Sequence, residues 1–86
     1  MKHFAEPSFW NYYRHLPKSI QQIADKNFDL LKVDTKHPSL HLKKLPKDFW
    51  SVRVGKGYRA LALEMSDGNL AWFWIGTHAE YDKLIK

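Results

Sequence analysis

The sequence predicts an α+β domain in which two N-terminal helices pack on a four-stranded, mainly antiparallel sheet with a short C-terminal helical turn. Between positions 9 and 31, apolar residues recur at three- and four-residue spacing, as in helices with one buried face. Apolar runs of strand length flank two glycine-containing turns at residues 55–57 and 66–69, as in an antiparallel meander. The 86 residues suffice for one core, so we expect a single domain over residues 1–86.

The N-terminal third is expected to hold the helices. Residues 2–5 are compatible with a short edge strand, and Ser8 stands where a helix N-cap is expected. Pro17 ends the first helix and opens the second, because proline fits only the first turn of a helix. The apolar stripe of the second helix comprises Ile20, Ile23, Ala24, Phe28 and Leu31. We interpret the aromatic residues of both helices as core rather than as a platform for stacking bases.

The first strand of the sheet is expected near residues 40–45. Leucines there alternate with His41 and Lys43, so these two polar residues are predicted to share a face that looks away from the core. The strand at residues 70–75 is almost wholly apolar and is predicted to be central or covered. Regular alternation in it would put Trp72 and Trp74 on one face and Phe73 and Ile75 on the other.

After that strand, the C-terminal segment is expected to form a helical turn. Tyr81, Leu84 and Ile85 have helical spacing, and we expect all three to pack back on the sheet.

The central hairpin gives the first functional signal. If residues 55–57 form a three-residue loop, Val54 pairs with Tyr58, and Arg53 falls opposite Arg59 on the same face. Like charges that face each other across a ladder are destabilising, whereas an anion between them would convert the pair into a clamp. The alternative is a bulge that shifts the register by one residue and sends the arginines to opposite faces.

Composition narrows the possible partners. Fourteen Lys and Arg against nine Asp and Glu give a net charge of +5, which favours an anionic partner such as nucleic acid or an acidic protein. The absence of cysteine excludes disulfides and thiolate chemistry. No apolar run is long enough for a signal peptide or a membrane span, so a soluble, cytoplasmic protein is expected. His37 and His41 lack a convincing third ligand, and we expect neither a metal nor any small-molecule cofactor.

The remaining polar residues fit a metal-free ribonuclease. Such an enzyme needs a base for the ribose 2′-OH, cations for the charge that develops on phosphorus, and an acid for the leaving 5′-oxygen. Arg53, Arg59 and Lys43 are candidate anion-binding groups, and His41 and His78 are candidate proton-transfer groups. The ordinary alternative is that these histidines and lysines are solvated surface residues.

Three stretches together resemble the RelE/ParE superfamily of type II toxin–antitoxin toxins, over nearly the whole chain. The stretches are Phe49-Trp50-Ser51-x-Arg53-Val54, Tyr58-Arg59-Ala60-Leu61 and Gly76-Thr77-His78-x-x-Tyr81. The first is similar to the YoeB-like branch, and the Gly-Thr-His ending is similar to the YafQ-like branch.

The resemblance implies a basic toxin that enters the ribosomal A site, cleaves mRNA without metal, and is held inactive by an acidic antitoxin. It implies that Arg59 is catalytic, that His78 is the general acid and that Arg53 binds phosphate. The glutamate base of the YoeB-like branch has no counterpart before Phe49, which leaves His41 or Lys43 as the base. We expect RNA to contact Lys43, Lys44, Lys56 and Tyr81.

Two other functions are compatible with the same fold, because one fold can host several activities. The ParE branch of the superfamily poisons DNA gyrase and generally lacks the catalytic set. A catalytically silent module that binds RNA or protein is the third reading, and the missing carboxylate base favours it.

Overall fold

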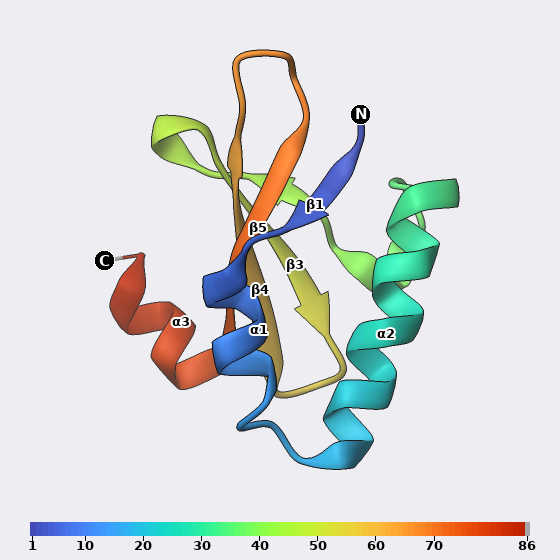
Figure 1. Ribbon diagram of the computed structural model, residues 1–86, viewed down its shortest axis with the longest axis vertical. Helices are drawn as coiled ribbons and strands as arrows, with labels where there is room; N and C mark the ends of the chain where they lie inside the picture. Colours follow the sequence, from blue (N-terminus) through green and yellow to red (C-terminus); the bar gives the residue numbers. More distant parts are fainter. Residues whose placement is uncertain (86) are drawn as a thin grey trace.

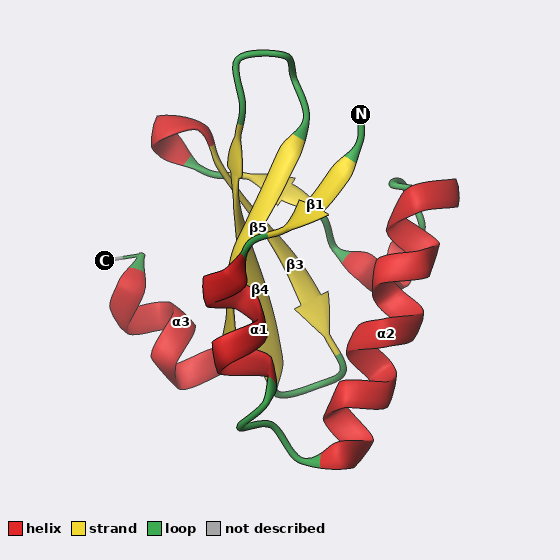
Figure 2. Ribbon diagram, viewed as in Figure 1, coloured by secondary structure: helices red, strands yellow, loops and turns green. Residues whose placement is uncertain are grey.

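The computed structural model describes residues 1–85 and shows an α+β fold of three helices and one five-stranded sheet (Figures 1 and 2). The elements in chain order are β1 (His3–Ala5), α1 (Pro7–Tyr13), α2 (Lys18–Val33), β2 (Lys43–Lys44), β3 (Phe49–Val54), β4 (Tyr58–Glu64), β5 (Leu70–Thr77) and α3 (His78–Leu84). The strand order is β1-β5-β4-β3-β2. No helix within the described residues is both long enough and apolar enough to cross a bilayer.

The sheet has one strand more than the four predicted. Strands β2 to β5 are antiparallel, whereas β1 pairs in parallel with β5, His3 lying opposite Leu70. The short edge strand considered at residues 2–5 is therefore present as β1, His3–Ala5, the fifth strand of the sheet.

Helices α1 and α2 cover one face of the sheet, as predicted, and α3 lies on the other flank (Figure 1). The apolar stripe of α2 faces the core, where Ala24 and Leu31 are buried and Ile20, Ile23 and Phe28 pack against them. The predicted N-cap of α1 was wrong. The helix begins at Pro7 after Glu6, and the Ser8 hydroxyl instead donates to the carbonyl of Phe73 at 2.8 Å.

A bulge in β5 corrects the predicted faces of its aromatic residues. Leu61 pairs with Trp74 and Ala62 with Trp72, so Phe73 is the extra residue. The bulge reverses the alternation at this point. Trp72 and Ile75 belong to the core beneath the helices, and Phe73 and Trp74 pack in a second cluster on the opposite face.

The strand predicted near residues 40–45 was too long. Pro38–Leu40 forms a 3₁₀ turn that buries Leu40 completely, and His41 has a left-handed backbone with φ of 46°. Only Lys43–Lys44 pairs with β3. His41 and Lys43 therefore do not lie on one strand, because the left-handed residue interrupts the alternation on which the prediction depended.

Helix α3 is anchored by its first turn. The Thr77 hydroxyl accepts from the backbone N–H of Glu80, and the Glu80 carboxylate accepts from the backbone N–H of Thr77, which is a capping box. These hydrogen bonds hold the pKa of Glu80 below its usual value. Tyr81 is buried, as predicted, but Leu84 and Ile85 are 56% and 45% exposed, because the seven-residue helix presents only Tyr81 to the sheet.

Candidate functional site

The hairpin formed by β3 and β4 has the predicted register. Residues 55–57 make the three-residue loop, Val54 pairs with Tyr58, and Arg53 lies directly opposite Arg59. Gly55 has φ of 61°, a conformation that glycine adopts without steric cost. The two arginines therefore share the sheet face opposite α1 and α2, as expected from the unbulged pairing.

Arg53 is held at both its backbone and its side chain. Its Nε donates to the carbonyl of Gly55 at 3.0 Å, and its own carbonyl accepts from the side-chain amide of Asn27 on α2 at 2.9 Å. These contacts fix the position of the side chain and leave the charge of the guanidinium without an ion-pair partner among residues 1–85.

Arg59 lies over the ring of Tyr81, with the guanidinium carbon 5.3 Å from the ring centroid. Its Nε and Nη1 are buried and make no hydrogen bond within the described chain. A cation on an aromatic face gains roughly 0.5–2 kcal/mol, but it keeps its full charge. Arg59 is thus held over the ring and is not neutralised by a carboxylate of the described chain.

His78 is tied to the same hairpin. It is the first residue of α3, and its backbone N–H donates to the carbonyl of Gly57 in the hairpin loop at 2.8 Å. Its exposed ring lies 5.8 Å from the ring of Tyr81, and Nδ1 is 3.1 Å from a carboxylate oxygen of Asp82. When Nδ1 carries the proton that Asp82 accepts, Nε2 is the nitrogen available for proton transfer.

The lysines expected to contact RNA lie in different places. Lys43 pairs with Ser51 and so lies on the face of Arg53, whereas Lys44 pairs with Trp50 on the other face. Lys44 forms ion pairs with Asp48 at 3.6 Å and Glu64 at 3.4 Å. Lys56 is exposed in the hairpin loop.

Glu64 is engaged in this second network. Trp50 Nε1 donates to its carboxylate at 2.8 Å, and this hydrogen bond, assisted by Lys44, lowers the pKa of Glu64.

The structure therefore brings together Arg53, Arg59, His78 and Tyr81, with Lys43 on the same face. His41 is exposed in the left-handed turn, and no described hydrogen bond or ion pair joins it to this group. Sequence reasoning missed Asp82, although its i, i+4 spacing from His78 on a helix was a readable signal.

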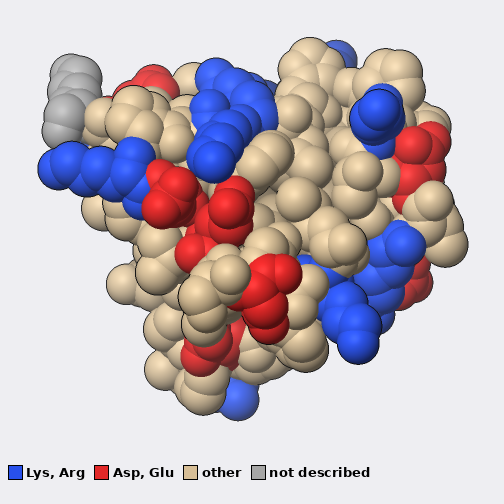
Figure 3. Space-filling view, turned by 90° about the horizontal axis from the view of Figure 1, so that it is seen from above, with Lys and Arg blue, Asp and Glu red and all other residues tan. Residues whose placement is uncertain are grey.

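Basic and acidic side chains are mixed at one end of the molecule. The end of the molecule seen in Figure 3 carries small, separate groups of basic and acidic side chains with uncharged surface between them. Within residues 1–85, no three His, Asp or Glu side chains are grouped so as to hold a metal ion. The candidate site is distinguished by the paired arginines.

Solved structures place the fold in the class of RelE-like toxins. The RelE of a RelB–RelE antitoxin–toxin complex from Methanococcus jannaschii superimposes with a TM-score of 0.73 at 14% identity, over 96% of this chain and 99% of that one. A YoeB/ParE toxin from Agrobacterium tumefaciens gives 0.67 at 16% identity, over 91% and 99%. A YoeB from Staphylococcus aureus, solved as a dimer, gives 0.67 at 12% identity, over 91% and 97%.

Sequence comparison shows the family. The model of the ParE-like toxin domain matches residues 18–83, which is most of the chain, and no curated protein sequence is a significant match. The protein belongs to the ParE-like toxin family, and the resemblance to the RelE/ParE superfamily is confirmed.

Proposed function

We propose that the protein is the toxin of a type II toxin–antitoxin system and acts as a metal-independent endoribonuclease on mRNA at the ribosome. The observation that carries the proposal is the pairing of Arg53 with Arg59 beside a histidine whose backbone is hydrogen-bonded to the same hairpin. Two facing cations are destabilising unless an anion lies between them, and a phosphodiester is such an anion.

The chemistry assigned to the site is transesterification. The ribose 2′-oxygen attacks the adjacent phosphorus as its proton passes to a base, the P–O5′ bond breaks, and the leaving 5′-oxygen receives a proton from His78. The products are a 2′,3′-cyclic phosphate and a 5′-hydroxyl. Arg53 and Arg59 hold the negative charge that accumulates on the phosphorane oxygens, the role in which fixed cations contribute most. Asp82 orients the imidazole so that Nε2 is presented to the leaving group.

Lys43 is favoured over His41 as the base. It lies opposite Ser51, two residues along the strand from Arg53, and diagonal neighbours in an antiparallel pair are about 7–8 Å apart, within reach of a long side chain. His41 stands outside the strand in a left-handed turn. We assign a further RNA contact to Lys56, which is exposed in the hairpin loop. Tyr81 is buried beneath Arg59, so its proposed role is to hold that guanidinium rather than to contact RNA.

The proposed partner that silences the toxin is a cognate antitoxin. Several similar structures are RelB–RelE complexes, in which an antitoxin is bound to a toxin of this fold. The +5 charge of the chain suits an acidic partner. Activity on ribosomes would place the protein in the cytoplasm.

The test is induced expression of the wild type, Arg59→Ala and His78→Ala in a bacterial host. Growth, amino-acid incorporation and mRNA 5′ ends are followed together. We expect growth arrest with new mRNA ends in register with codons for the wild type, and neither effect for the two variants. Lys18→Ala, exposed at the start of α2 on the opposite side of the sheet, is the matched control and should arrest growth like the wild type. Cleavage that survives in Arg59→Ala would eliminate this site.

A second candidate function is inhibition of DNA gyrase. It is favoured by one observation, namely that the matching family model is the ParE-like one. In that case expression would induce the DNA-damage response and arrest growth without new mRNA ends, and His78→Ala would remain toxic.

A further inference from the structure

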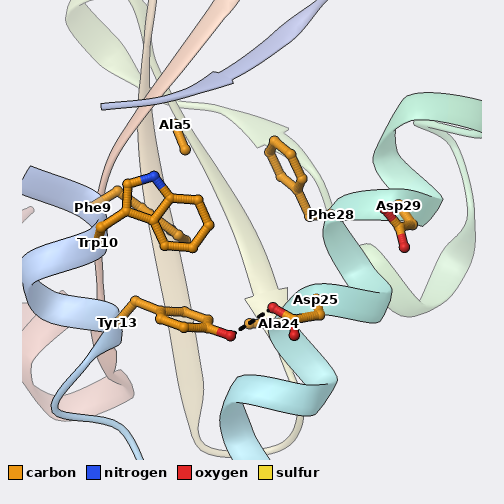
Figure 4. Close-up of a pocket in the computed structure, with 8 residues that line it drawn as sticks. All are labelled: Ala5, Phe9, Trp10, Tyr13, Ala24, Asp25, Phe28 and Asp29. Atoms are coloured by element: carbon orange, nitrogen blue, oxygen red, sulfur yellow. Dashed lines mark hydrogen bonds between the residues drawn. The ribbon is translucent and has the colours of Figure 1, made fainter. Parts of the chain in front are cut away.

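A cavity opens between α1 and α2, on the side of the sheet away from Arg59 (Figure 4). Its volume is about 170 Å³, and its lining includes four aromatic rings and two carboxylates, Phe9, Trp10, Tyr13, Phe28, Asp25 and Asp29. Small-molecule sites usually measure about 300–1,000 Å³, so this cavity suits a single long side chain rather than a cofactor.

The walls are aromatic rings at steep angles to one another. The rings of Trp10 and Tyr13 are 5.1 Å apart at 80°, and Phe28 lies across from them on α2 (Figure 4). The face of an aromatic ring attracts cations through its quadrupole. Phe28 already shows this behaviour, since Lys32 Nζ lies 4.5 Å from its ring centroid.

The rim of the cavity is acidic. Asp25 accepts a hydrogen bond from the Tyr13 hydroxyl at 2.8 Å, and Asp29 lies one turn farther along α2 (Figure 4). Burial together with the neighbouring carboxylate raises the pKa of Tyr13. Within residues 1–85 neither aspartate is in an ion pair, although like charges at i, i+4 destabilise a helix. A cation bound at the rim would relieve this repulsion.

We propose that this aromatic cavity receives an arginine side chain of the antitoxin. A planar guanidinium stacks on rings and pairs with a carboxylate at the same time, which a leucine side chain cannot do. The acidic rim disfavours RNA, whose phosphates would meet Asp25. The identity of the partner rests on the proposed function, but the chemistry of the cavity does not. Because the cavity and Arg59 lie on opposite sides of the sheet, this contact anchors the antitoxin without itself covering the paired arginines.

The first test measures binding of a small probe to the purified chain. The Arg59→Ala variant is used so that the protein can be produced without its partner. N-acetyl-arginine methylamide is titrated while the Trp10 indole signal, assigned with Trp10→Phe, is followed by NMR. We expect saturable binding at least about fivefold tighter than that of the citrulline analogue, which keeps the shape and lacks the charge. Asp25→Asn should weaken it, and Asp67→Asn, on the β4–β5 loop, should not.

Three outcomes of this titration would overturn the arginine site. They are absence of binding, equal binding of the citrulline analogue, and tighter binding of N-acetyl-leucine methylamide. None of them bears on toxicity, so the cavity and the proposed function fail separately.

The second test identifies the partner through neutralisation in cells. The toxin is co-expressed with its cognate antitoxin, which is sought among the proteins encoded beside its gene. Asp25→Lys should arrest growth as the wild type does when alone, but should require roughly tenfold more antitoxin for rescue, a loss typical of an interface charge reversal. Asp67→Lys should be rescued normally. Equal rescue of Asp25→Lys and the wild type would show that no arginine of the antitoxin occupies the cavity.

Discussion

At the scale of single residues, Arg59 is held by an aromatic ring rather than by a carboxylate. Stacking on Tyr81 fixes the direction of the guanidinium. Arg53, directly opposite on the neighbouring strand, repels it. The arrangement contributes little to folding stability, because repulsion and two nitrogens without hydrogen bonds offset the gain from stacking. An anion bound between the two arginines would remove this repulsion.

Replacement of Arg59 by alanine should separate activity from stability. We expect RNA cleavage to fall by at least about 100-fold, since a preorganised charge at the reacting phosphate is removed. The free energy of unfolding should change by less than about 1 kcal/mol. Cleavage of an mRNA by purified protein with ribosomes, and urea denaturation of the same samples, measure the two effects. A large loss of stability would mean that Arg59 is a structural residue.

His3 should make folding stability depend on pH. Its Nδ1 accepts from the indole N–H of Trp72 at 3.1 Å, and burial, assisted by the N-terminal ammonium and Lys32, lowers the pKa of this histidine from 6.5. As the pH falls below 6.5, His3 is therefore protonated in the unfolded chain at a higher pH than in the folded chain. The contribution of His3 to the free energy of unfolding is therefore fully present above pH 6.5. It decreases as the pH falls toward the lower pKa that His3 has in the folded state.

The measurement is the urea midpoint between pH 7.5 and pH 5. The midpoint of the wild type should decrease over this range, and His3→Gln, which keeps an acceptor for Trp72, should show a smaller decrease. Identical slopes for the two proteins would assign the pH dependence to other groups.

At the scale of elements, the junction of β5 and α3 determines where the site residues stand. Gly76 lies opposite Arg59, and the indole of Trp74 occupies the space where a side chain on Gly76 would be. The next residue, Thr77, caps α3 and so sets the position of His78. Packing of one tryptophan and one capping box thus places the proposed acid beside the proposed phosphate site.

Alanine at position 76 should disturb this junction. Its Cβ would lie 2.5 Å from Cζ2 of Trp74 and 2.9 Å from the Glu80 carboxylate, so the indole and the capping box would have to move. We expect a loss of about 1–3 kcal/mol in the free energy of unfolding, typical of overpacking. Gly57→Ala is the matched control, because a Cβ there meets nothing within 4 Å. Urea denaturation of both variants measures the difference. Equal free energies of unfolding for Gly76→Ala and Gly57→Ala would contradict this prediction.

Elements formed by contacts between residues close in sequence were easier to predict than the others. The pairing of Arg53 with Arg59 was predictable, because a short glycine-bounded loop fixes the register of its own hairpin. The bulge at Phe73 was not, since an extra residue in a ladder leaves no pattern in an almost uniformly apolar strand. The left-handed turn at His41 was also missed, because leucines spaced by two residues resemble a strand.

The candidate site divides in the same way. The pairing of the arginines followed from local geometry. His78 was a candidate from its chemistry alone, whereas its role as the acid and the assignment of Tyr81 came with the resemblance to a family. The proximity of His78 and Tyr81 to the arginines depends on β5 pairing with β4 and on α3 folding back, which are tertiary events.

At the scale of the whole molecule, the sheet separates the candidate site from the aromatic cavity between the helices. Two surfaces result. One carries the facing arginines, and the other carries helices whose groove is aromatic and acidic. A net charge of +5 therefore does not describe either surface alone, and RNA is expected to engage only the first.

The salt dependence of RNA binding should reflect the few cations of that first surface. If Lys43, Arg53, Lys56 and Arg59 each meet one phosphate, the logarithm of affinity should fall with the logarithm of salt concentration with a slope of about −2.8, at roughly −0.7 per phosphate on a single strand. Arg53→Ala should make the slope shallower by about 0.7. Fluorescence anisotropy with a labelled single-stranded RNA gives both values, and an unchanged slope in the variant would remove Arg53 from the interface.

Because β1 pairs with β5, the sheet cannot form completely until β5 has been synthesised. The carbonyl of Lys2 accepts from the backbone N–H of Leu70, so the first strand made must wait for the strand made last. Contacts of such wide sequence separation form slowly, because a long loop must close before they provide any stabilisation. A nascent chain that lacks residues 70–78 has neither β5, the strand that joins β1 to the sheet, nor His78. Synthesis therefore has to pass residue 78 before the proposed site can form.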